Sequence, residues 1–303
     1  MIAISLCMIV RDEEAVLGRC LDSVAPYVDE IVIVDTGSTD RTKEIAREYG
    51  AAVYDFEWID DFAAARNFAF SKATRDYILW LDADDLLLPE DGERLGVLKR
   101  TLDPAYNTVT MPYVLATDDA GRPTFSLRRN RLVKRACGFR WIGAVHEYLE
   151  VSGPVFHSDV RVTHDIRKAW TDRNLRIYRA RQARGETFSP RDLYYFANEL
   201  RDHGFCGEAR EYYEQFLDTG RGWVEDNIQA CLKLAECCRR LGDSSAEFRA
   251  LCRSFLYDRP RGEVCYRLGE YFLGRDRVEQ AVFWFETAIR LPVPEDAMGM
   301  RNP

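Results

Sequence analysis

Short apolar runs alternate with helix-like segments through the first 81 residues of the chain. The apolar runs occupy residues 4–10, 30–35, 51–54 and 77–81, and helical spacing covers 13–24, 43–49 and 62–73. The runs are almost continuously apolar, as strands are when both faces of their sheet are covered. Turn and capping residues fill 36–40, and Gly50 ends the second helix. This order predicts an α/β fold with a mostly parallel sheet and helices on both faces.

The pattern changes near Asn107. Residues 108–116, 126–133 and 155–163 are typical of strands, and no long helical pattern separates them. Strands without crossover helices pair antiparallel more readily than parallel. We therefore expect antiparallel strands and loops at one end of the sheet.

The chain is helical in pattern from about Lys168 to its end. Three helical pairs share small residues at matching places: Gly204, Gly242 and Gly274 after each first helix, and Ala209, Ala246 and Ala281 early in each second helix. The spacing is near the roughly 34-residue period of tetratricopeptide-like arrays, with a plain helical bundle as the alternative. Together with the length of 303 residues, this predicts two domains, 1–167 and 168–303.

Composition narrows the classes of protein that the chain can belong to. A net charge of -8 and a pI near 5.3 argue against a nucleic-acid partner bound by a broad basic face. We expect no membrane span, because the apolar runs fall short of the ~18 residues needed, and we see no signal peptide.

Six of the nine cysteines lie in the last third without a C-x-x-C pair. They predict buried free thiols in a reducing, cytoplasmic setting rather than a zinc site.

Asp82-Ala83-Asp84-Asp85 follows the fourth apolar run directly. In a parallel α/β sheet, ligands bind beyond the carboxyl ends of the strands. Carboxylates held this close together are costly unless a cation compensates them, and Mg²⁺ or Mn²⁺ suits such oxygen ligands. The alternative is an acidic N-cap for the helix that follows Pro89.

The second apolar run ends in an acid and a turn, Asp35 to Asp40. An acidic residue at such a place can hold a ribose or a base edge. The sequence contains neither G-x-G-x-x-G nor a Walker-A lysine, so dinucleotide-binding and ATP-hydrolysing functions lose their main support.

Four segments in order, 8–14, 30–40, 61–67 and 81–84, resemble family 2 glycosyltransferases of the GT-A fold. The resemblance covers about the first 165 residues. It extends to a subgroup in which this domain precedes tetratricopeptide-like helices and which includes bacteriocin-precursor S-glycosyltransferases of the sublancin type. Such enzymes are hexosyltransferases that use a nucleotide sugar.

The resemblance implies roles for individual residues. The residues it assigns to nucleotide-sugar binding are Val10, Arg11, Glu13, Asp35, Arg66, Asp82 and Ala83. Among them, Glu13 and Asp35 would contact the base and ribose, Arg66 the nucleotide or diphosphate, and Asp82 the ribose or sugar. Asp84 would hold Mn²⁺ or Mg²⁺, with Asp85 outside the coordination sphere. Arg11-Asp12 stand where many relatives have Asn before Glu, which leaves the detail of base recognition open.

A later segment of the resemblance supplies the remaining chemistry. Val145-His146-Glu147 matches a V-H-E motif, and His164 follows a strand as in the subgroup. Glu147 is the candidate general base, favoured over His146. His164 would be a metal ligand or a diphosphate contact, with a buried structural histidine as the alternative.

The basic stretch 128–135 has two open interpretations. Its four arginines and Lys134 are either solvated charge on an edge strand or a contact for a diphosphate or an acidic acceptor.

These observations predict an inverting, metal-dependent transfer of sugar from a UDP-sugar or related donor. A peptide or protein acceptor is favoured, and the helical region would bind it, form a homodimer, or both. One alternative is a cell-envelope polysaccharide or lipopolysaccharide glycosyltransferase. Another, from a different class, is a catalytically silent nucleotide-binding scaffold that carries a helical-repeat interaction module.

Overall fold

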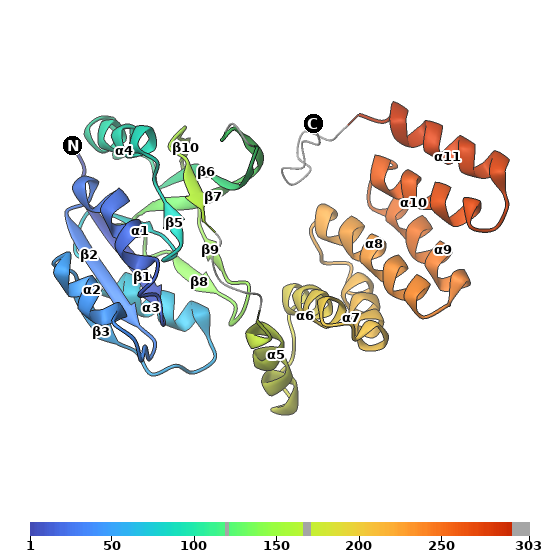
Figure 1. Cartoon of the computed structure of the whole chain (residues 1–303), viewed down its shortest axis with the longest axis horizontal. Helices are drawn as coiled ribbons and strands as arrows, with labels where there is room; N and C mark the ends of the chain where they lie inside the picture. The colour runs from blue at the N-terminus through green and yellow to red at the C-terminus, as the bar shows by residue number, and fades with distance from the viewer. Residues whose placement is uncertain (119–120, 166–170, 293–303) are drawn as a thin grey trace. The chain divides into compact units, whose positions relative to one another are not determined.

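The computed structural model describes residues 1–118, 121–165 and 171–292, which form two compact units (Figure 1). The first unit holds the described residues up to 165, and the second holds those from 171 onward. The predicted domain boundary between 167 and 168 lies outside the described residues. The division of roles between 1–167 and 168–303 is therefore taken up below as a proposal.

The first unit alternates strands and helices before it becomes mostly β. Its strands are β1 Ile4–Val10, β2 Glu30–Asp35, β3 Ala52–Asp55, β4 Tyr77–Trp80, β5 Asp85–Leu86, β6 Thr108–Thr117, β7 Pro123–Lys134, β8 Arg140–Ile142, β9 Tyr148–Glu150, β10 Val155–His157 and β11 Val162–His164. Its α-helices are α1 Leu17–Val24, α2 Thr42–Glu48, α3 Phe62–Lys72 and α4 Pro89–Thr101.

One large sheet organises this unit. Its strand order is β3-β2-β1-β4-β7-β6-β11-β5, with β10 also paired to β6. The strands β3, β2, β1 and β4 are parallel, β7 is antiparallel to both of its neighbours, and β11 is again parallel to β6. The prediction of a mostly parallel sheet is confirmed. The β8–β9 hairpin forms a separate small sheet.

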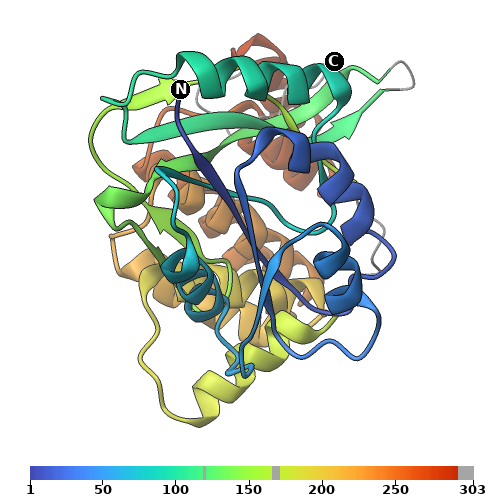
Figure 2. The same cartoon turned by 90° about the vertical axis from the view of Figure 1, so that its left-hand side faces the viewer.

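Each face of the large sheet has its own apolar core. Leu6 and Met8 of β1 pack with α1, α2 and α4, whereas Cys7 between them packs with α3 and the β8–β9 hairpin. In Figure 2, α1 and α2 lie to the right of the central strands and α3 to their left. This two-sided burial explains why β1 is apolar at nearly every position. The prediction of helices on both faces is confirmed as well.

Some boundaries differ from the sequence pattern. The first helix begins at Leu17 rather than Glu13, because Asp12 takes a left-handed φ of 51° and turns precede the helix. The predicted strand 155–163 is two strands, β10 and β11, separated where the Ser158 hydroxyl accepts the N–H of Val160. The short strands β5, β8 and β9 have no counterpart in the sequence analysis.

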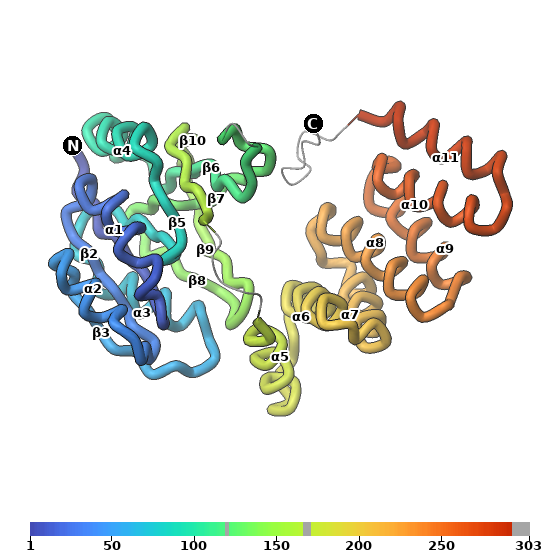
Figure 3. Tube along the Cα trace, in the orientation of Figure 1, coloured from blue at the N-terminus to red at the C-terminus, as the bar shows by residue number. Residues whose placement is uncertain are grey.

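The second unit is entirely helical. Its α-helices are α5 Arg173–Ala183, α6 Pro190–Asp202, α7 Cys206–Asp218, α8 Val224–Arg240, α9 Ser244–Arg253, α10 Gly262–Leu273 and α11 Val278–Arg290. Figure 3 traces α6–α7, α8–α9 and α10–α11 as three successive hairpins. Gly204, Gly242 and Gly274 follow the first helix of each hairpin, as the repeat interpretation predicts. The region is tetratricopeptide-like.

Small and aromatic side chains join these hairpins. Ala209, Ala246 and Ala281 are buried at the matching place in each second helix. Phe248 of α9 packs on Tyr271 of α10 with ring centroids 5.1 Å apart, which links the second and third hairpins. All nine cysteines are free, and most are buried, as expected of thiols used as small apolar residues. Among the described residues, no helix is both long and apolar enough to cross a bilayer.

Two glycines of the helical unit give opposite stability predictions. A Cβ at Gly222 would lie 2.4 Å from Cζ of the buried Phe216, whereas one at Gly207 in α7 would meet nothing within 4 Å. We expect Gly222→Ala to lower the free energy of unfolding by about 1–3 kcal/mol through overpacking. Gly207→Ala should raise it by about 0.5–1 kcal/mol, because alanine restricts the unfolded chain more. Urea unfolding of both variants checks the pair; equal effects would contradict the described packing.

Candidate active site

The carboxyl ends of β1, β2 and β4 meet at one edge of the large sheet. Val10 is paired with Asp35 at the ends of β1 and β2, and Cys7 of β1 is paired with Trp80, the last residue of β4. Loops that follow parallel strands gather at this edge, where ligands bind in open α/β sheets. The sequence-predicted residues from three separate segments therefore lie on neighbouring strand ends.

The loops after β1 and β2 are tied together. The carbonyl of Val10 accepts hydrogen bonds from the backbone N–H (3.0 Å) and hydroxyl (3.1 Å) of Thr36. The carboxylate of Asp12 accepts the backbone N–H of Thr39 at 2.8 Å. The N–H of Glu13 donates to the hydroxyl of Thr42 at 2.7 Å. These hydrogen bonds hold the loop after β1 against the loop after β2, and the carbonyl of Val10 accepts two of them.

Asp35 carries a buried acceptor at this edge. The residue is 1% exposed, and its Oδ1 accepts the backbone N–H groups of Gly37 and Ser38, both at 2.9 Å. Its Oδ2 is buried and has no hydrogen-bond partner in the described part of the chain. A buried acceptor without a partner is costly, so this oxygen suits a donor group on a ligand.

Residues 82–85 form a closed turn after β4. The N–H of Asp85 donates to the carbonyl of Asp82 at 3.0 Å, and the N–H of Asp82 donates to Oδ2 of Asp85 at 2.9 Å. Ala83 is buried in the core. The next helix starts at Pro89 with Leu88 as its N-cap residue. The alternative that these acids cap that helix is therefore wrong.

His164 reaches the acidic turn through strand pairing. The antiparallel pair β5–β11 places His164 opposite Asp85, and the N–H of Asp165 donates to the carbonyl of Asp84 at 2.9 Å. The Nδ1 atom of His164 lies 3.6 Å from Oδ1 of Asp84 and 3.7 Å from Oδ1 of Asp85. Strand β5 thus brings together residues that are far apart in the sequence.

These three side chains have the composition of a divalent-metal site. Asp84, Asp85 and His164 each offer a ligand atom within 4.8 Å of the others, and no other such group is found in the residues that the structure describes. Oδ1 of Asp85 and Nδ1 of His164 are buried without a hydrogen-bond partner there. The donor set therefore fits a cation. Asp85, which the sequence analysis leaves outside the coordination sphere, lies within this group.

The surrounding charges shift the pKa values of Asp82 and Asp84 in opposite directions. Burial raises the pKa of Asp82, but the charges of Arg66 and Arg131 outweigh it and bring the pKa below its ordinary 3.8. Burial also raises the pKa of Asp84; His164 and a backbone hydrogen bond oppose the rise, and the neighbouring Asp82 and Asp85 add to it. The negative charge of Asp84 is thus less well compensated than that of Asp82, as expected of a carboxylate that binds a cation.

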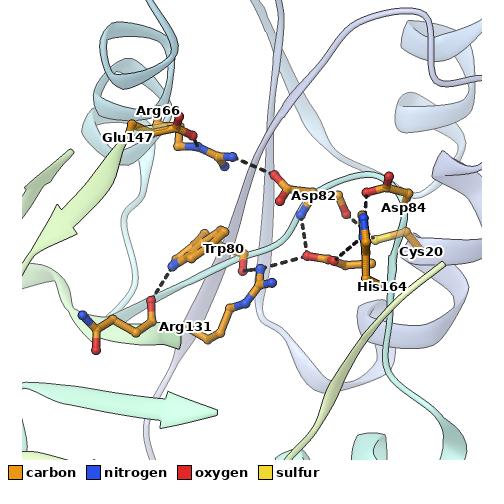
Figure 4. Close-up of polar contacts among 10 residues, drawn as sticks. Cys20, Arg66, Trp80, Asp82, Asp84, Arg131, Glu147 and His164 are labelled. Carbon is orange, nitrogen blue, oxygen red and sulfur yellow. Dashed lines mark hydrogen bonds and ion pairs between the residues drawn. The ribbon is translucent and has the colours of Figure 1, made fainter. Parts of the chain in front are cut away.

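Arg66 joins Asp82 to Glu147 (Figure 4). Its Nη2 donates to Asp82 at 2.7 Å and its Nε donates to Glu147 at 2.6 Å. The guanidinium lies 5.1 Å from the ring centroid of Trp80 and 4.7 Å from that of Trp141. The candidate base is therefore held beside the acidic turn. His146, the rival base, is half-buried with a left-handed φ of 51°.

The basic stretch lies partly in the interior of the large sheet and partly where a neighbouring strand is present on one side only. It belongs to β7, which is paired with β4 on one side and β6 on the other. Arg131 is 1% exposed and donates to Asp85 at 2.8 Å. Arg128 is exposed and donates to the carbonyl of Ser158 at 3.0 Å. The solvated-edge interpretation is therefore wrong for Arg131, which is also too deeply buried to meet a diphosphate directly. Arg128 and Arg129 are exposed where β7 is paired with β6 alone.

Sequence reasoning missed Trp80, Trp141 and the inward role of Arg131. Trp80 ends an apolar strand and Trp141 belongs to the unpredicted hairpin, so both resemble ordinary core residues. Arg131 is one of several adjacent basic residues, and nothing in the sequence distinguishes the buried one.

His164 gives the site a pH dependence with a defined sign. Asp85 raises the pKa of His164 above its ordinary 6.5, burial opposes this, and Asp84 adds to the rise. A pKa that is higher in the folded than in the unfolded state contributes stability that is complete below the unfolded-state pKa and is lost as pH rises through the folded-state pKa.

We expect the metal-free protein to lose thermal stability as pH rises above about 6.5, relative to His164→Gln. Mn²⁺ should stabilise it more over the same range, since a ligand imidazole must be neutral. Melting curves from pH 5.5 to 8.5 with and without Mn²⁺ measure both; identical pH slopes in the two proteins would contradict this role.

This chain is similar in sequence to known proteins. Residues 5–135 match the family described as Glycosyl transferase family 2. A TPR repeat-containing protein of Synechococcus elongatus is 32% identical over 97% of this chain, and the match covers 67% of that protein. The SPbeta prophage-derived glycosyltransferase SunS of Bacillus subtilis is 27% identical over 76% of this chain, and the match covers 58% of SunS.

Two solved structures also align with this chain. S. aureus TarS 1-349, in complex with UDP-GlcNAc, aligns over 99% of this chain and 98% of its own with 14% identity and a TM-score of 0.44. Glucosyl-3-phosphoglycerate synthase from Mycobacterium tuberculosis, in complex with Mn²⁺ and uridine-diphosphate-glucose, aligns over 62% and 81% with 15% identity and a TM-score of 0.42. The family match shows that residues 5–135 of this protein are a family 2 glycosyl transferase domain, and a tetratricopeptide-like helical region follows it.

Proposed function

We propose that this glycosyltransferase moves a sugar from a UDP-sugar to an acceptor, with a divalent metal bound and with inversion at the anomeric carbon. The observation that carries the proposal is the Arg66 bridge. It holds Asp82 and Glu147 on one guanidinium, directly beside the group formed by Asp84, Asp85 and His164. A candidate base is thereby linked, through Arg66 and Asp82, to the turn that carries the candidate metal ligands Asp84 and Asp85.

The nucleotide would occupy the edge formed by the β1 and β2 loops. The unpartnered Oδ2 of Asp35 would accept an N–H from the base, which a uracil ring offers. Glu13 would face the ribose, and Asp82 the ribose or sugar. The remaining residues that we propose for this site are Val10, Arg11, Arg66 and Ala83. Of these, Arg66 would act from behind Asp82, because its Nε and Nη2 atoms already donate to Glu147 and Asp82.

Asp84, Asp85 and His164 would hold the metal. A bound divalent cation would act as a Lewis acid that neutralises charge on the departing diphosphate. Two carboxylates suit either Mn²⁺ or Mg²⁺, but an imidazole nitrogen favours Mn²⁺, since Mg²⁺ prefers oxygen ligands. We therefore propose Mn²⁺ as the more effective ion.

Glu147 would act as the general base. In a single displacement, the acceptor atom forms a bond to the anomeric carbon while the bond from that carbon to the diphosphate oxygen breaks. The acceptor proton passes to Oε of Glu147. The carboxylate is 11% exposed and its orientation is set by Arg66, which supports the fixed position that a general base needs.

We further propose that residues 1–167 form the catalytic domain and that 168–303 bind the acceptor or form a homodimer. A peptide or protein acceptor is favoured, because stacked helical hairpins build surfaces suited to extended chains. SunS, with which this chain shares sequence through both regions, is a glycosyltransferase. A cell-envelope polysaccharide acceptor is the competing outcome of the test below.

The experiment has two stages. Thermal shifts of the full chain with UDP-glucose, UDP-GlcNAc, UDP-galactose and GDP-mannose, each with and without Mn²⁺, identify the donor. Transfer from that donor is then measured by mass spectrometry on peptides that contain Cys, Ser or Thr, and separately on lipid-linked envelope extracts. Mn²⁺-dependent transfer to peptides supports the proposal. Transfer to the extracts alone would move the acceptor to the envelope, and a thermal shift with a donor but no transfer to either kind of acceptor would support a silent nucleotide-binding scaffold.

A further inference from the structure

Arg131 is a fully buried charge in the middle of the large sheet. It lies on β7, an interior strand, and is 1% exposed. Its guanidinium is 4.0 Å from the ring centroid of Trp80 and 4.4 Å from that of Tyr113. Placing an arginine in such surroundings is costly unless its charge and donors are matched. The buried guanidinium of Arg131 therefore needs a partner of opposite charge that accepts its hydrogen bonds.

Its principal partner is Asp85. Nη1 of Arg131 donates to Oδ2 of Asp85 at 2.8 Å and lies 3.3 Å from the carbonyl oxygen of Trp80. Asp85 is 0% exposed, so both members of this ion pair are shielded from water. A buried pair of this kind is held in one geometry, since neither member has water as an alternative partner.

The two oxygens of Asp85 have different partners. Oδ2 accepts from Arg131 and also from the backbone N–H of Asp82, which closes the acidic turn. Oδ1 has no hydrogen-bond partner in the described chain and lies 3.7 Å from Nδ1 of His164. By engaging Oδ2, Arg131 leaves Oδ1 directed toward the candidate metal group.

The three acids of residues 82–85 have different ion-pair partners. Of the three acids in the turn, Asp82 is paired with Arg66 and Asp85 with Arg131. Asp84 has His164 as its ion-pair partner among the described residues. The two arginines let the turn close before any cation arrives, so that binding does not require the acids to be gathered first.

We infer that Arg131 is a positioning residue that sets the metal affinity of the acidic turn through Asp85, without touching metal or substrate. This inference rests on the proposed function only in taking Asp84, Asp85 and His164 as metal ligands. Residues that orient metal ligands from outside typically change metal affinity by about 10–100-fold when mutated.

The test measures Mn²⁺ binding to the full chain without nucleotide, by the electron paramagnetic resonance signal of free Mn²⁺. Arg131→Lys keeps the charge but loses the planar guanidinium fork. We expect its Mn²⁺ dissociation constant to rise about 10–100-fold at a temperature where circular dichroism shows a folded protein. Arg131→Gln, which keeps donors without the charge, makes the same prediction if the lysine variant unfolds too readily.

Arg261→Lys is the matched control. Arg261 is also buried and donates to the buried Glu225 at 2.5 Å, but it lies in the helical unit. We expect this control to lower the melting temperature and leave Mn²⁺ affinity at the wild-type value. Folded Arg131 variants with wild-type Mn²⁺ affinity would overturn the positioning role and leave the proposed metal site intact. Absence of Mn²⁺ binding in the wild type would overturn both.

Discussion

Replacing Asp84 by asparagine is expected to reduce Mn²⁺-dependent transfer by roughly 1,000-fold, as loss of a main charge-stabilising contact does elsewhere. Asp84 is the acid of the turn with a raised pKa and no arginine partner among the described residues. Its carboxylate is repelled by Asp82 and Asp85 when no cation is present. Asparagine removes that repulsion, so the metal-free variant should melt at a higher temperature than the wild type.

This combination separates a metal ligand from a structural acid. Loss of a structural acid lowers activity and stability together, whereas Asp84→Asn should lower activity and raise metal-free stability. The measurements are kcat/KM with a saturating series of Mn²⁺ and melting temperature in a chelator. Glu90→Gln is the control, since its side chain is 82% exposed at the start of α4. Unchanged Mn²⁺ dependence of transfer in Asp84→Asn would remove this residue from the metal site.

Glu147→Gln is the second large effect. A positioned general base typically contributes about 100–10,000-fold to the rate, and glutamine cannot take up the acceptor proton. Glutamine keeps an oxygen that can accept from Nε of Arg66, so the local structure should persist. We expect kcat to fall within that range while the affinity for UDP-sugar and Mn²⁺ stays within a few-fold of wild type.

Two further variants make this result specific. Glu150→Gln changes an exposed acid on β9, close in sequence but outside the Arg66 contacts, and should retain activity. His146→Gln tests the rival base and should cost far less than Glu147→Gln. If His146→Gln gave the larger loss in kcat, the roles of the two residues would be reversed. Rates are measured under single-turnover conditions, so that product release does not mask the chemical step.

Much of the catalytic fold can be predicted from the sequence, because its strands are buried on both faces. The bounds of β1 and β2 agree with the apolar runs, and the parallel order follows from the alternation with helices. The sequence also predicts that the acids following these strands lie close together, since the carboxyl ends of parallel strands share one edge of the sheet.

The contacts that complete the site depend on features without a local pattern. Strand β5 has only two residues, yet its pairing with β11 brings His164 to Asp85. Arg66 and Glu147 are 81 positions apart, and their contact depends on where α3 and the loop between β8 and β9 pack. Arg131 is buried by tertiary packing alone. Periodicity reports which face of an element is apolar, but it does not report which distant charge meets that face.

The paired roles within the acidic turn have an evolutionary consequence. Asp85 is bound to a buried arginine, so most substitutions there would be removed by selection for folded protein before catalysis is tested. Its neighbour Asp84, which we expect to lower the stability of the metal-free protein, would be lost by drift if the activity were no longer needed. A relative that keeps Asp85 and Arg131 but has lost Asp84 would therefore carry the signature of an enzyme that has become a non-catalytic binding protein while its fold endured.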